Sequence, residues 1–416
     1  MQEADRGAYQ VPLRTIAREW GRIGCIGFGG PPAHIALLRA LCVDRRGWIS
    51  AAEFEDGVAT CNMLPGPAST QLAIFCAWRL RGTLGALIGG ACFIVPGLIV
   101  ILGLSAVFLA PHPPLWIRGA AAGAGAAVPV VALSAAIGLA PASWRRAGAA
   151  RPARAMAARP ARARWACYLV IGGVAGALVG PFLVLILIGC GLLEMLVRTR
   201  PYARLRHPAG RPAAENPQGL GALALLAKLA APAAPAVVTG GLLSVAWVAF
   251  KVGALSYGGG FVIVPLMQHD AVTTYHWMTS AQFLSAVALG QVTPGPVVQT
   301  VAVVGYAAAG VGGGLLASFV AFTPSFAFVL IGGPRFDQLR RNAGVQAFLT
   351  GAGPAAIGAI AGASIPLGLA LSHLWQVALV ALAAAWLVAL RRGVVTAIVG
   401  AGVLGIIAVL AGAPVG

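Results

Sequence analysis

Charged residues are scarce in this sequence of 416 residues. Only 10% of them are Asp, Glu, Lys or Arg, and 59% are hydrophobic, whereas a soluble domain carries about 25% charged residues. A soluble protein of this length could not bury so much apolar surface. Apolar runs of about 15–25 residues recur along the chain, the length that a bilayer about 30 Å thick requires of a helix. Because these runs are continuous rather than alternating, we expect an all-α polytopic membrane protein and not a β-barrel.

Several signatures of enzymes and metal proteins are missing from the sequence. There is no GxxxxGK[ST] motif, no HExxH motif and no CxxC pair among the seven cysteines, and the six histidines are scattered. We therefore expect no catalytic residues, no metal site and no cofactor, with the cysteines acting as small apolar packing residues. The first residues also lack the basic start and short apolar core of a signal peptide.

Acidic residues are few, and the chain carries a net charge of +18. The basic residues lie in loops between apolar runs, so the positive-inside rule explains them better than nucleic-acid binding does. Residues 144–164 hold seven arginines and no acid, which predicts a cytoplasmic loop that can meet anionic lipid headgroups. A second polar stretch, residues 198–218, is rich in Arg and Pro and predicts a linker. We expect no nucleic-acid partner.

An internal repeat is the strongest signal in the sequence. Sliding the chain on itself by 229 residues aligns two regions without a gap. The matches include two glycines, a tryptophan and a Pro-Gly-Pro motif: Gly29-Gly30 with Gly258-Gly259, Trp48 with Trp277, and Pro65-Gly66-Pro67 with Pro294-Gly295-Pro296. Chance agreement in apolar sequence would not hold these residue types in one register. We expect two homologous repeats, residues 1–215 and 216–416.

The loops of the two repeats differ in charge. Five arginines flank the motifs of the first repeat, and the residues 229 positions later are uncharged: Arg39, Arg45, Arg46, Arg79 and Arg81 against Gln268, Thr274, Tyr275, Ala308 and Gly310. Since cytoplasmic loops gather Lys and Arg, the equivalent loops are expected on opposite sides of the membrane. This predicts an inverted repeat with broken or re-entrant helices. The number of crossings stays open between about ten and fourteen, because residues 165–196 and 375–410 can each form one long helix or a hairpin.

The first repeated motif is rich in glycine. It reads Gly27-Phe28-Gly29-Gly30-Pro31-Pro32 in the first repeat and Ser256-Tyr257-Gly258-Gly259-Gly260 in the second. Glycine and proline break a helix, and non-helical backbone in a bilayer must be buried in protein or line a wet cavity. The motif therefore predicts a broken helix whose free amide groups bind an anion. The alternative is close helix packing at small residues.

The second repeated motif surrounds Pro-Gly-Pro. Pro65-Gly66-Pro67 is followed by Thr70 and Gln71, and Pro294-Gly295-Pro296 is followed by Gln299 and Thr300. Each motif is expected to end one helix and start another, with hydroxyl and amide donors near the turn. This predicts a polar re-entrant tip. The alternative is a kink whose polar side chains satisfy freed carbonyl groups.

Charged and titratable residues near the motifs are further candidates. Arg22 and Lys251 occupy equivalent positions six residues before the aromatic residue of the first motif, and would supply positive charge to an oxyanion. The alternative for both is an interfacial side chain. His34, Glu53 and Asp56 are candidates for proton coupling. The alternative for the two acids is that they neutralise surface arginines such as Arg45 and Arg46.

In combination, these motifs resemble the long-chain members of the chromate ion transporter family, in which two homologous domains are fused. The resemblance covers residues 15–135 and 240–370. It rests on Phe28-Gly29-Gly30-Pro31, Arg45-Arg46-Gly47-Trp48-Ile49-Ser50, Leu64-Pro65-Gly66-Pro67, Thr70-Gln71-Leu72-Ala73, Tyr257-Gly258-Gly259-Gly260, Gln291, Thr293-Pro294-Gly295-Pro296 and Gly305-Tyr306.

The resemblance implies a secondary transporter, not an enzyme, that exports chromate across the inner membrane and confers resistance. The driving force would be the proton motive force or the membrane potential, and sulfate would compete. The alternative is a carrier of sulfate or another oxyanion, and a homo-oligomer stays open. Departures at Pro32-Ala33-His34 and Gln268-His269-Asp270 affect substrate selectivity rather than the fold. A membrane scaffold or membrane-embedded enzyme would not explain duplicated helix breaks.

Overall fold

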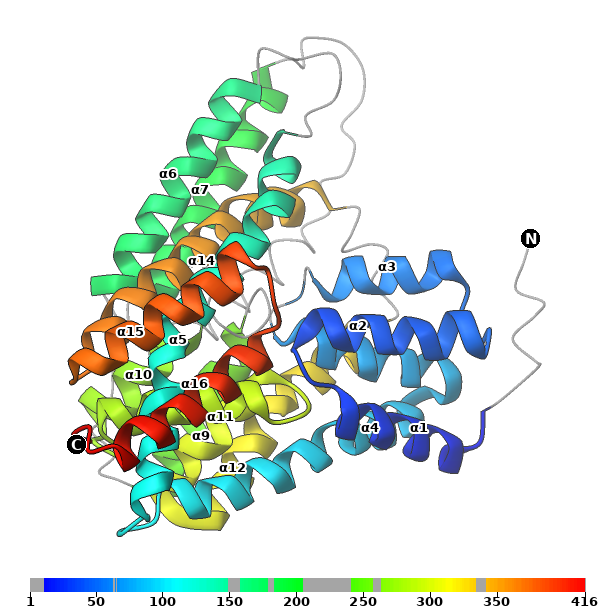
Figure 1. The fold of residues 1–416 in the computed structure, drawn as a ribbon. Helices are drawn as coiled ribbons and strands as arrows, with labels where there is room; N and C mark the ends of the chain where they lie inside the picture. The colour runs from blue at the N-terminus through cyan, green and yellow to red at the C-terminus, as the bar shows by residue number, and fades with distance from the viewer. Residues whose placement is uncertain are drawn as a thin grey trace, which may run out of the picture.

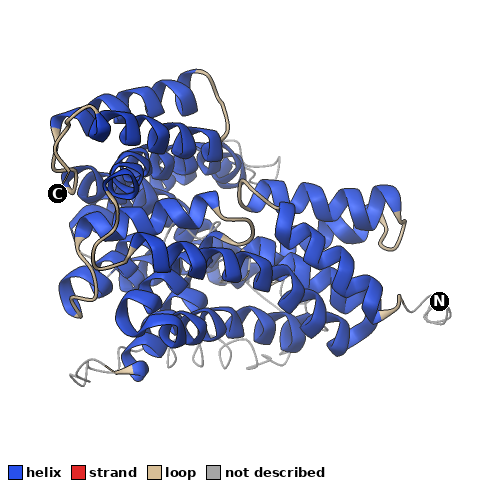
Figure 2. Cartoon of the chain, turned by 60° about the horizontal axis from the view of Figure 1, so that its bottom comes forward, coloured by secondary structure: helices blue, strands red, loops and turns tan. Residues whose placement is uncertain are grey.

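Helices account for the regular structure in the described part of this chain (Figures 1 and 2). The computed structural model describes residues 11–62, 64, 66–148, 158–178, 183–204, 241–256, 263–333 and 342–415, and these ranges contain no strand. Four of their helices are long and apolar enough to cross a membrane, namely α4, α5, α12 and α14. The expectation of an all-α polytopic membrane protein is confirmed.

The helices of the first half begin with short elements and continue with long ones. They are α1 (Leu13–Ile26), α2 (Pro31–Arg39), the π-helical turn η1 (Ala40–Arg45), α3 (Ala51–Cys61), α4 (Ala68–Phe108), α5 (Leu115–Gly148), α6 (Ala158–Leu178) and α7 (Leu183–Arg204). The second half repeats this order in α9 (Leu242–Leu255), α10 (Ile263–Gln268), η4 (His269–Thr274), α11 (Ser280–Val292), η5 (Val297–Gln299), α12 (Thr300–Gly332), α14 (Ala343–Leu369), α15 (Leu374–Ala384), η7 (Ala385–Ala389) and α16 (Val394–Leu410).

Local details of the two halves correspond. A π-helical turn follows α2 and α10 at equivalent positions, and the hydroxyls of Ser50 and Thr279 cap α3 and α11 in the same way. Beyond the Pro-Gly-Pro motifs the offset between the halves changes from 229 to 228 residues, because Gly82 of α4 matches Gly310 of α12. The counterparts of Arg79 and Arg81 are therefore Ala307 and Ala309, which corrects the predicted pairing by one residue and leaves the loss of charge unchanged.

A sharp bend divides both α4 and α12. In α4 it lies at Arg81 (φ −151°, ψ 25°) and Gly82 (φ 61°, ψ −150°), and in α12 at Ala309 (φ −153°, ψ 32°) and Gly310 (φ 62°, ψ −154°). Only glycine adopts such a positive φ without strain. Each long element therefore consists of a short helix that starts at the Pro-Gly-Pro motif and a longer helix that returns. This bend was not predicted from the sequence.

The long parts of α4 and α12 run antiparallel. Gly90 of α4 faces Phe326 near the end of α12, whereas Leu102 near the end of α4 faces Gly314 near the start of the long part of α12. Figure 1 also places α2 and α3 to the right and α10 and α11 to the left. Two equivalent helices that run in opposite directions are related by a two-fold axis between them. The halves are therefore homologous and inverted, as the loop charges predicted.

The C-terminal hairpins are exchanged between the halves. The hairpin of α6 and α7 packs on α14 of the second half, and the hairpin of α15 and α16 packs on α5 of the first half (Figure 1). Glycines make these contacts close: an added Cβ at Gly172 or Gly176 in α6 would overlap the backbone of α14. Of the two alternatives for residues 165–196 and 375–410, the hairpin is the one that forms.

Two predicted connections differ from the structure. Helices extend into the predicted loop 144–164 from both sides, since α5 ends at Gly148 and α6 begins at Ala158, and residues 149–157 lie outside the described residues. Helix α7 likewise continues to Arg204, into the predicted linker 198–218. The predicted boundary at residue 215 falls within residues 205–240, which also lie outside the described ranges.

Candidate functional site

The two Pro-Gly-Pro tips meet the broken helices of the opposite halves. The amide of Gly66 donates a hydrogen bond to the Ser256 carbonyl at the end of α9 (2.5 Å), and the amide of Gly295 donates one to the Gly27 carbonyl at the end of α1 (3.0 Å). Both glycines have positive φ, +119° and +96°. Because Gly27 and Ser256 are equivalent residues, the two bonds form a reciprocal pair that joins the halves.

The long parts of α4 and α12 enclose the tips. The amide of Gln299 donates to the Ile94 carbonyl of α4 (2.6 Å), and an added Cβ at Gly97 would overlap the Pro294 carbonyl. On the other side, an added Cβ at Gly66 would lie 3.2 Å from the Ser325 hydroxyl of α12. Gly97 and Ser325 are equivalent residues, so each long helix contacts the tip of the opposite half.

Polar atoms without partners gather in this centre. The Oγ1 of Thr70, the Oγ of Ser256 and the Oγ of Ser325 are fully buried and have no hydrogen-bond partner within the described part of the chain, and the same is true of the Gln299 Oε1. Leaving such a group unsatisfied costs about 1–3 kcal/mol. Four of them around two helix breaks indicate a position for a polar ligand or for water.

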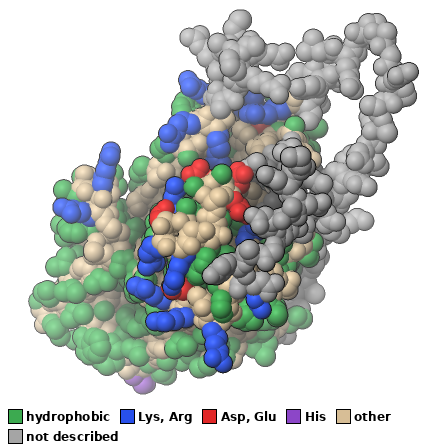
Figure 3. All heavy atoms as spheres, turned by 90° about the vertical axis from the view of Figure 1, so that its right-hand side faces the viewer, with side chains coloured by type: hydrophobic (Ala, Val, Ile, Leu, Met, Phe, Trp, Pro, Cys, Tyr) green, Lys and Arg blue, Asp and Glu red, His purple; other side chains and the backbone are tan. Residues whose placement is uncertain are grey.

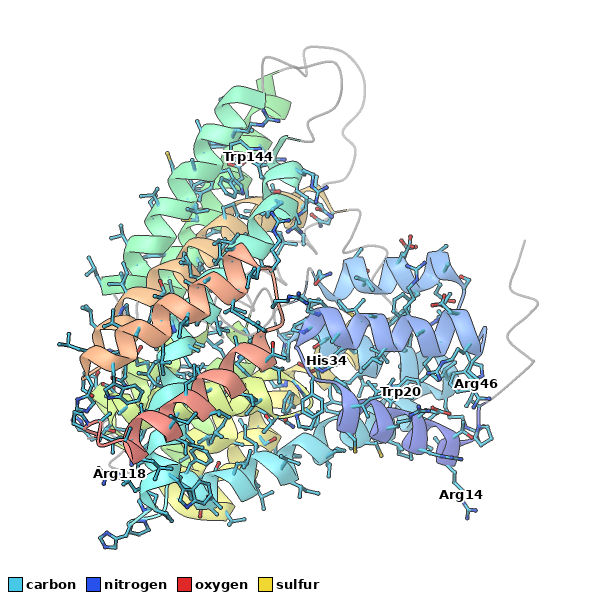
Figure 4. All side chains as sticks on the ribbon, viewed as in Figure 1. Arg14, Trp20, His34, Arg46, Arg118 and Trp144 are labelled. Atoms are coloured by element: carbon cyan, nitrogen blue, oxygen red, sulfur yellow. The ribbon has the colours of Figure 1, made fainter. Side chains whose placement is uncertain are left out.

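His34 lies beside the first broken helix (Figure 4). Its buried ring places Nε2 2.9 Å from the Gly27 carbonyl and Nδ1 3.2 Å from the Ser69 hydroxyl, and it packs perpendicular to the Phe93 ring, with 5.0 Å between the ring centroids. A carbonyl only accepts, so Nε2 carries the proton and Nδ1 accepts from Ser69 when the ring is neutral. The Gly27 carbonyl thus receives hydrogen bonds from both His34 and Gly295. The equivalent residue in the second half is Ile263, so the two sides of the centre differ chemically.

The glycine-rich motif breaks the first helix as predicted. Helix α1 ends at Ile26, Gly29 and Gly30 have φ values of +98° and +74°, and α2 starts at Pro31. An added Cβ at Gly30 would lie 3.6 Å from Val297, so the N-terminus of α2 faces the second tip. In the second half α9 ends at Leu255 and α10 begins at Ile263. The predicted ligands Gly258, Gly259 and Gly260 lie outside the described residues, as does Pro65.

The two predicted cations differ in their exposure and in their partners. Arg22 is exposed on α1, whereas Lys251 is largely buried and forms an ion pair with Asp270, with Nζ 2.6 Å from Oδ2. Lys251 is therefore not an unpaired cation, and the two residues do not form a symmetric pair around the centre. Asp270 was not predicted as the partner of Lys251.

The remaining candidates divide between the centre and the surface. Gln71 is fully buried beside Gly66, while Thr300 uses its hydroxyl locally, donating to the Val297 carbonyl (2.8 Å). Pro67 and Pro296 precede their helices in extended conformation.

The acidic candidates lie at the surface. Asp56 is exposed on α3. Ion pairs join three glutamates of this region to surface arginines: Glu53 with Arg79, Glu55 with Arg39, and Glu19 with Arg46. Acids do neutralise arginines here, but Glu53 pairs with Arg79 rather than with Arg45 or Arg46.

A basic surface and a cavity lie next to the first broken helix. Figure 3 shows Lys and Arg side chains gathered on the face that is to the right in Figure 1, where α2 and α3 lie. A cavity of about 270 Å³ opens between these two helices, with Arg39 and Glu55 in its wall and Pro32 of the glycine-rich motif at its lining. The cavity gives solvent an approach to the segment that carries His34.

Ser256 and Ser325 of this centre were not predicted as site residues. Ser256 was part of the glycine-rich motif, but only the fold shows that its hydroxyl is buried without a partner and that its carbonyl binds Gly66. Ser325 follows Pro324 in an apolar run, and a single serine there carries no signal of its own. A polar residue after a helix-internal proline, at a position where the other half has Gly97, could have identified it.

The sequence of this chain can be compared with those of known proteins. The pattern that defines the chromate transporter family matches residues 14–195 and 243–406. The chain is 31% identical over 357 residues to the chromate transport protein of Cupriavidus metallidurans, which spans 85% of this chain and 82% of that protein. It is 29% identical over 384 residues to the probable chromate transport protein of Synechococcus elongatus, with 90% of each chain covered.

A third relative is the chromate transport protein of Pseudomonas aeruginosa, 30% identical over 357 residues, which covers 83% of this chain and 79% of that protein. No solved structure is similar to this chain. The family pattern covers both inverted halves, including both Pro-Gly-Pro tips and the long apolar helices between them. This multi-pass membrane protein therefore belongs to the chromate transporter family.

Proposed function

We propose that this chain is a secondary transporter that exports chromate across the inner membrane and confers chromate resistance. The relatives from Cupriavidus metallidurans and Pseudomonas aeruginosa are chromate transport proteins. The observation that carries the proposal is the reciprocal pair of hydrogen bonds at Gly66 and Gly295, surrounded by buried polar atoms without partners. A site at the junction of two inverted repeats is where secondary transporters bind their substrates.

The centre suits a tetrahedral oxyanion because it offers donors. The hydroxyls of Thr70, Ser256 and Ser325 can each donate a hydrogen bond, and the short helices that begin at Ala68 and Thr300 direct their N-termini toward the tips. A helix N-terminus carries partial positive charge and unpaired amide groups, which favour an anion. Arg22 and the basic face attract anions toward the protein from outside this centre.

Transport then requires the junction to open alternately to the two sides. In this proposal the two tip bonds, Gly66 to Ser256 and Gly295 to Gly27, break and form as the halves rock about the two-fold axis. The basic face would lie in the cytoplasm. Since that face bears the cavity beside Pro32, chromate would enter along α2.

The ligand role of the serines can be tested by substitution. We expect Ser256→Ala and Ser325→Ala to raise the KM for chromate about 10-fold or more each, because a hydrogen bond to a charged ligand contributes about 1.5–3 kcal/mol. Ser105→Ala is the matched control, since this buried α4 hydroxyl already donates to the Ile101 carbonyl (2.7 Å). Uptake of chromate into everted vesicles measures KM. Unchanged KM in both variants would place the substrate elsewhere.

The direction and the driving force need a separate experiment. Everted membrane vesicles that contain the protein should accumulate chromate when energised, and a protonophore should abolish the accumulation. Vesicles without the protein are the control. Accumulation that persists without a proton motive force would contradict secondary transport driven by it.

A carrier of sulfate is the second candidate, because the same donors are offered to any tetrahedral dianion. None of the side chains in the centre recognises the metal of chromate; they recognise only charge and oxygen. Excess sulfate should therefore inhibit chromate flux. Growth on limiting sulfate, with and without the protein, distinguishes the two functions: improved growth without chromate resistance would identify a sulfate carrier.

A further inference from the structure

One buried ion pair of the second half has no counterpart at the equivalent position of the first half. Lys251 of α9 and Asp270 of η4 approach to 2.6 Å, with side chains that are 18% and 6% exposed. The equivalent residues of the first half are Arg22, which is exposed, and Leu41, which is buried. The same local fold therefore forms with an apolar residue at the second position.

Stability does not explain the pair. Burying two charges costs desolvation free energy, and replacing a buried ion pair by apolar residues is often neutral or stabilising. The first half uses Leu41 at this position. Charged residues inside an otherwise apolar helix such as α9 are rare and usually functional. Asp270 also lies in a π-helical turn, a feature frequent at functional sites.

Asp270 and Lys251 have no other oppositely charged side chain among the described residues of α9, α10 and α11. Helices α10 and α11 pack against η4, and α9 reaches it through the ion pair. Lys251, which also lies over the Trp247 ring, is the one charged or titratable group in the described residues of these three helices. His269 precedes Asp270 in η4, and Tyr275 and His276 follow the turn. Among these groups Asp270 is the only acid, so its carboxylate alone can neutralise the Lys251 ammonium.

The pair is connected to the candidate site through α9. Lys251 lies five residues before Ser256, roughly 7.5 Å along the helix axis, and the Ser256 carbonyl binds Gly66 of the first tip. Side chains of a helix lean toward its N-terminus, so the ammonium acts on the centre through its electric field rather than by contact. With Asp270 ionised, the two charges largely cancel at the centre. With Asp270 protonated, the ammonium charge is uncompensated and favours an anion there.

We propose that Asp270 is a positioning residue that couples oxyanion binding to proton binding, by masking the charge of Lys251 when it is ionised and releasing that charge when it is protonated. The step is a simple proton transfer: the carboxylate takes one proton from water and becomes a carboxylic acid, and the lysine stays protonated. The affinity for a dianion then rises as the pH falls, so the anion and the proton move together. The complex carries a net charge of −1, and its export is driven by the membrane potential, which is negative inside, and not by the pH gradient. This inference rests on the proposed oxyanion transport but assigns a role to a residue outside the donor set.

The test measures sulfate and chromate binding to the purified full-length protein by calorimetry, together with flux in proteoliposomes, across the pH range in which the protein stays folded. Wild-type protein should bind chromate more tightly at lower pH and take up a proton on binding. Asp270→Asn should bind tightly at every pH and lose the proton uptake. Asp44→Asn, an exposed acid in the equivalent turn of the first half, is the matched control and should keep the wild-type pH dependence.

The double variant Lys251→Met with Asp270→Asn separates coupling from folding. It should fold, bind weakly and show no dependence on pH, because both charges are absent. A wild-type pH dependence in Asp270→Asn would overturn the proposal, and so would weak binding in Asp270→Asn together with tight binding in the double variant. If the wild-type protein neither binds nor moves either anion, the proposed function itself fails, which is a different outcome.

Discussion

Gly97 of α4 should be intolerant of even one additional methyl group. A Cβ at this position would overlap the Pro294 carbonyl and lie 2.5 Å from the Oε1 of Gln299. The carbonyl belongs to a tip that is held by the bond from Gly295 to Gly27, so it cannot move away alone. In Gly97→Ala, either α4 or the tip must therefore shift.

The cost can be estimated from two effects. Overpacking a tight site costs about 1–3 kcal/mol. A shift of α4 also weakens the hydrogen bond from Gln299 to the Ile94 carbonyl, now 2.6 Å long, which contributes about 1 kcal/mol. A total of about 2–4 kcal/mol lowers the equilibrium constant for closing the contact between α4 and the second tip by roughly 30-fold to 1000-fold. We expect chromate flux to fall by at least the lower factor.

The assay compares Gly97→Ala with Gly103→Ala on the same helix, where an added Cβ would meet no atom within 4 Å. Chromate flux in everted vesicles and thermal unfolding in detergent are measured for both, at matched expression. Gly103→Ala should resemble the wild type in both measurements. If Gly97→Ala also did so, the close contact between α4 and the second tip would be refuted, and with it the arrangement of the candidate site.

Three further results are expected. Gly253→Ala should lower the unfolding temperature because its Cβ would overlap the backbone of α12, whereas Gly312→Ala, which has open space, should not. Glu194→Gln should lower the free energy of unfolding by about 1–3 kcal/mol, measured by denaturant titration, because this buried carboxylate pairs with two partly exposed arginines; an unchanged value would mean that the pairs contribute nothing. Cysteines placed at Arg79 and Ala307 should react with an impermeant reagent from opposite sides of the membrane, and labelling from one side would contradict the inverted arrangement.

Much of the fold could be predicted from the sequence because each motif occurs twice, and two weak indications of a helix break at the same offset support each other. The glycine-rich and Pro-Gly-Pro motifs each predicted a helix break, and their duplication at one offset predicted two homologous halves. The charges of Arg39, Arg45 and Arg46 against uncharged counterparts predicted the inversion, which the antiparallel α4 and α12 confirm. These features are local, or follow from comparing one half with the other.

The contacts between the halves could not be predicted in the same way. Which tip binds which broken helix depends on the packing of helices distant in sequence, and small residues such as Gly97 and Gly172 carry no information about their partners. The bends at Gly82 and Gly310 were missed because a single glycine in a membrane helix is equally typical of close packing. Lys251 seemed an unpaired cation because nothing in the sequence links it to its partner, Asp270, which lies 19 residues later in the chain.

The exchange of hairpins has a consequence for synthesis on the ribosome. When the first half has been translated, the hairpin of α6 and α7 and the helix α5 are both present, but α14, α15 and α16, against which they pack, have not yet been made. The glycine-lined faces of α6 and α5 therefore stay in contact with lipid until the second half has been inserted. Two separately produced halves, residues 1–215 and 216–416, should therefore restore the protein only when both are inserted into the same membrane, and neither should reach its native packing alone.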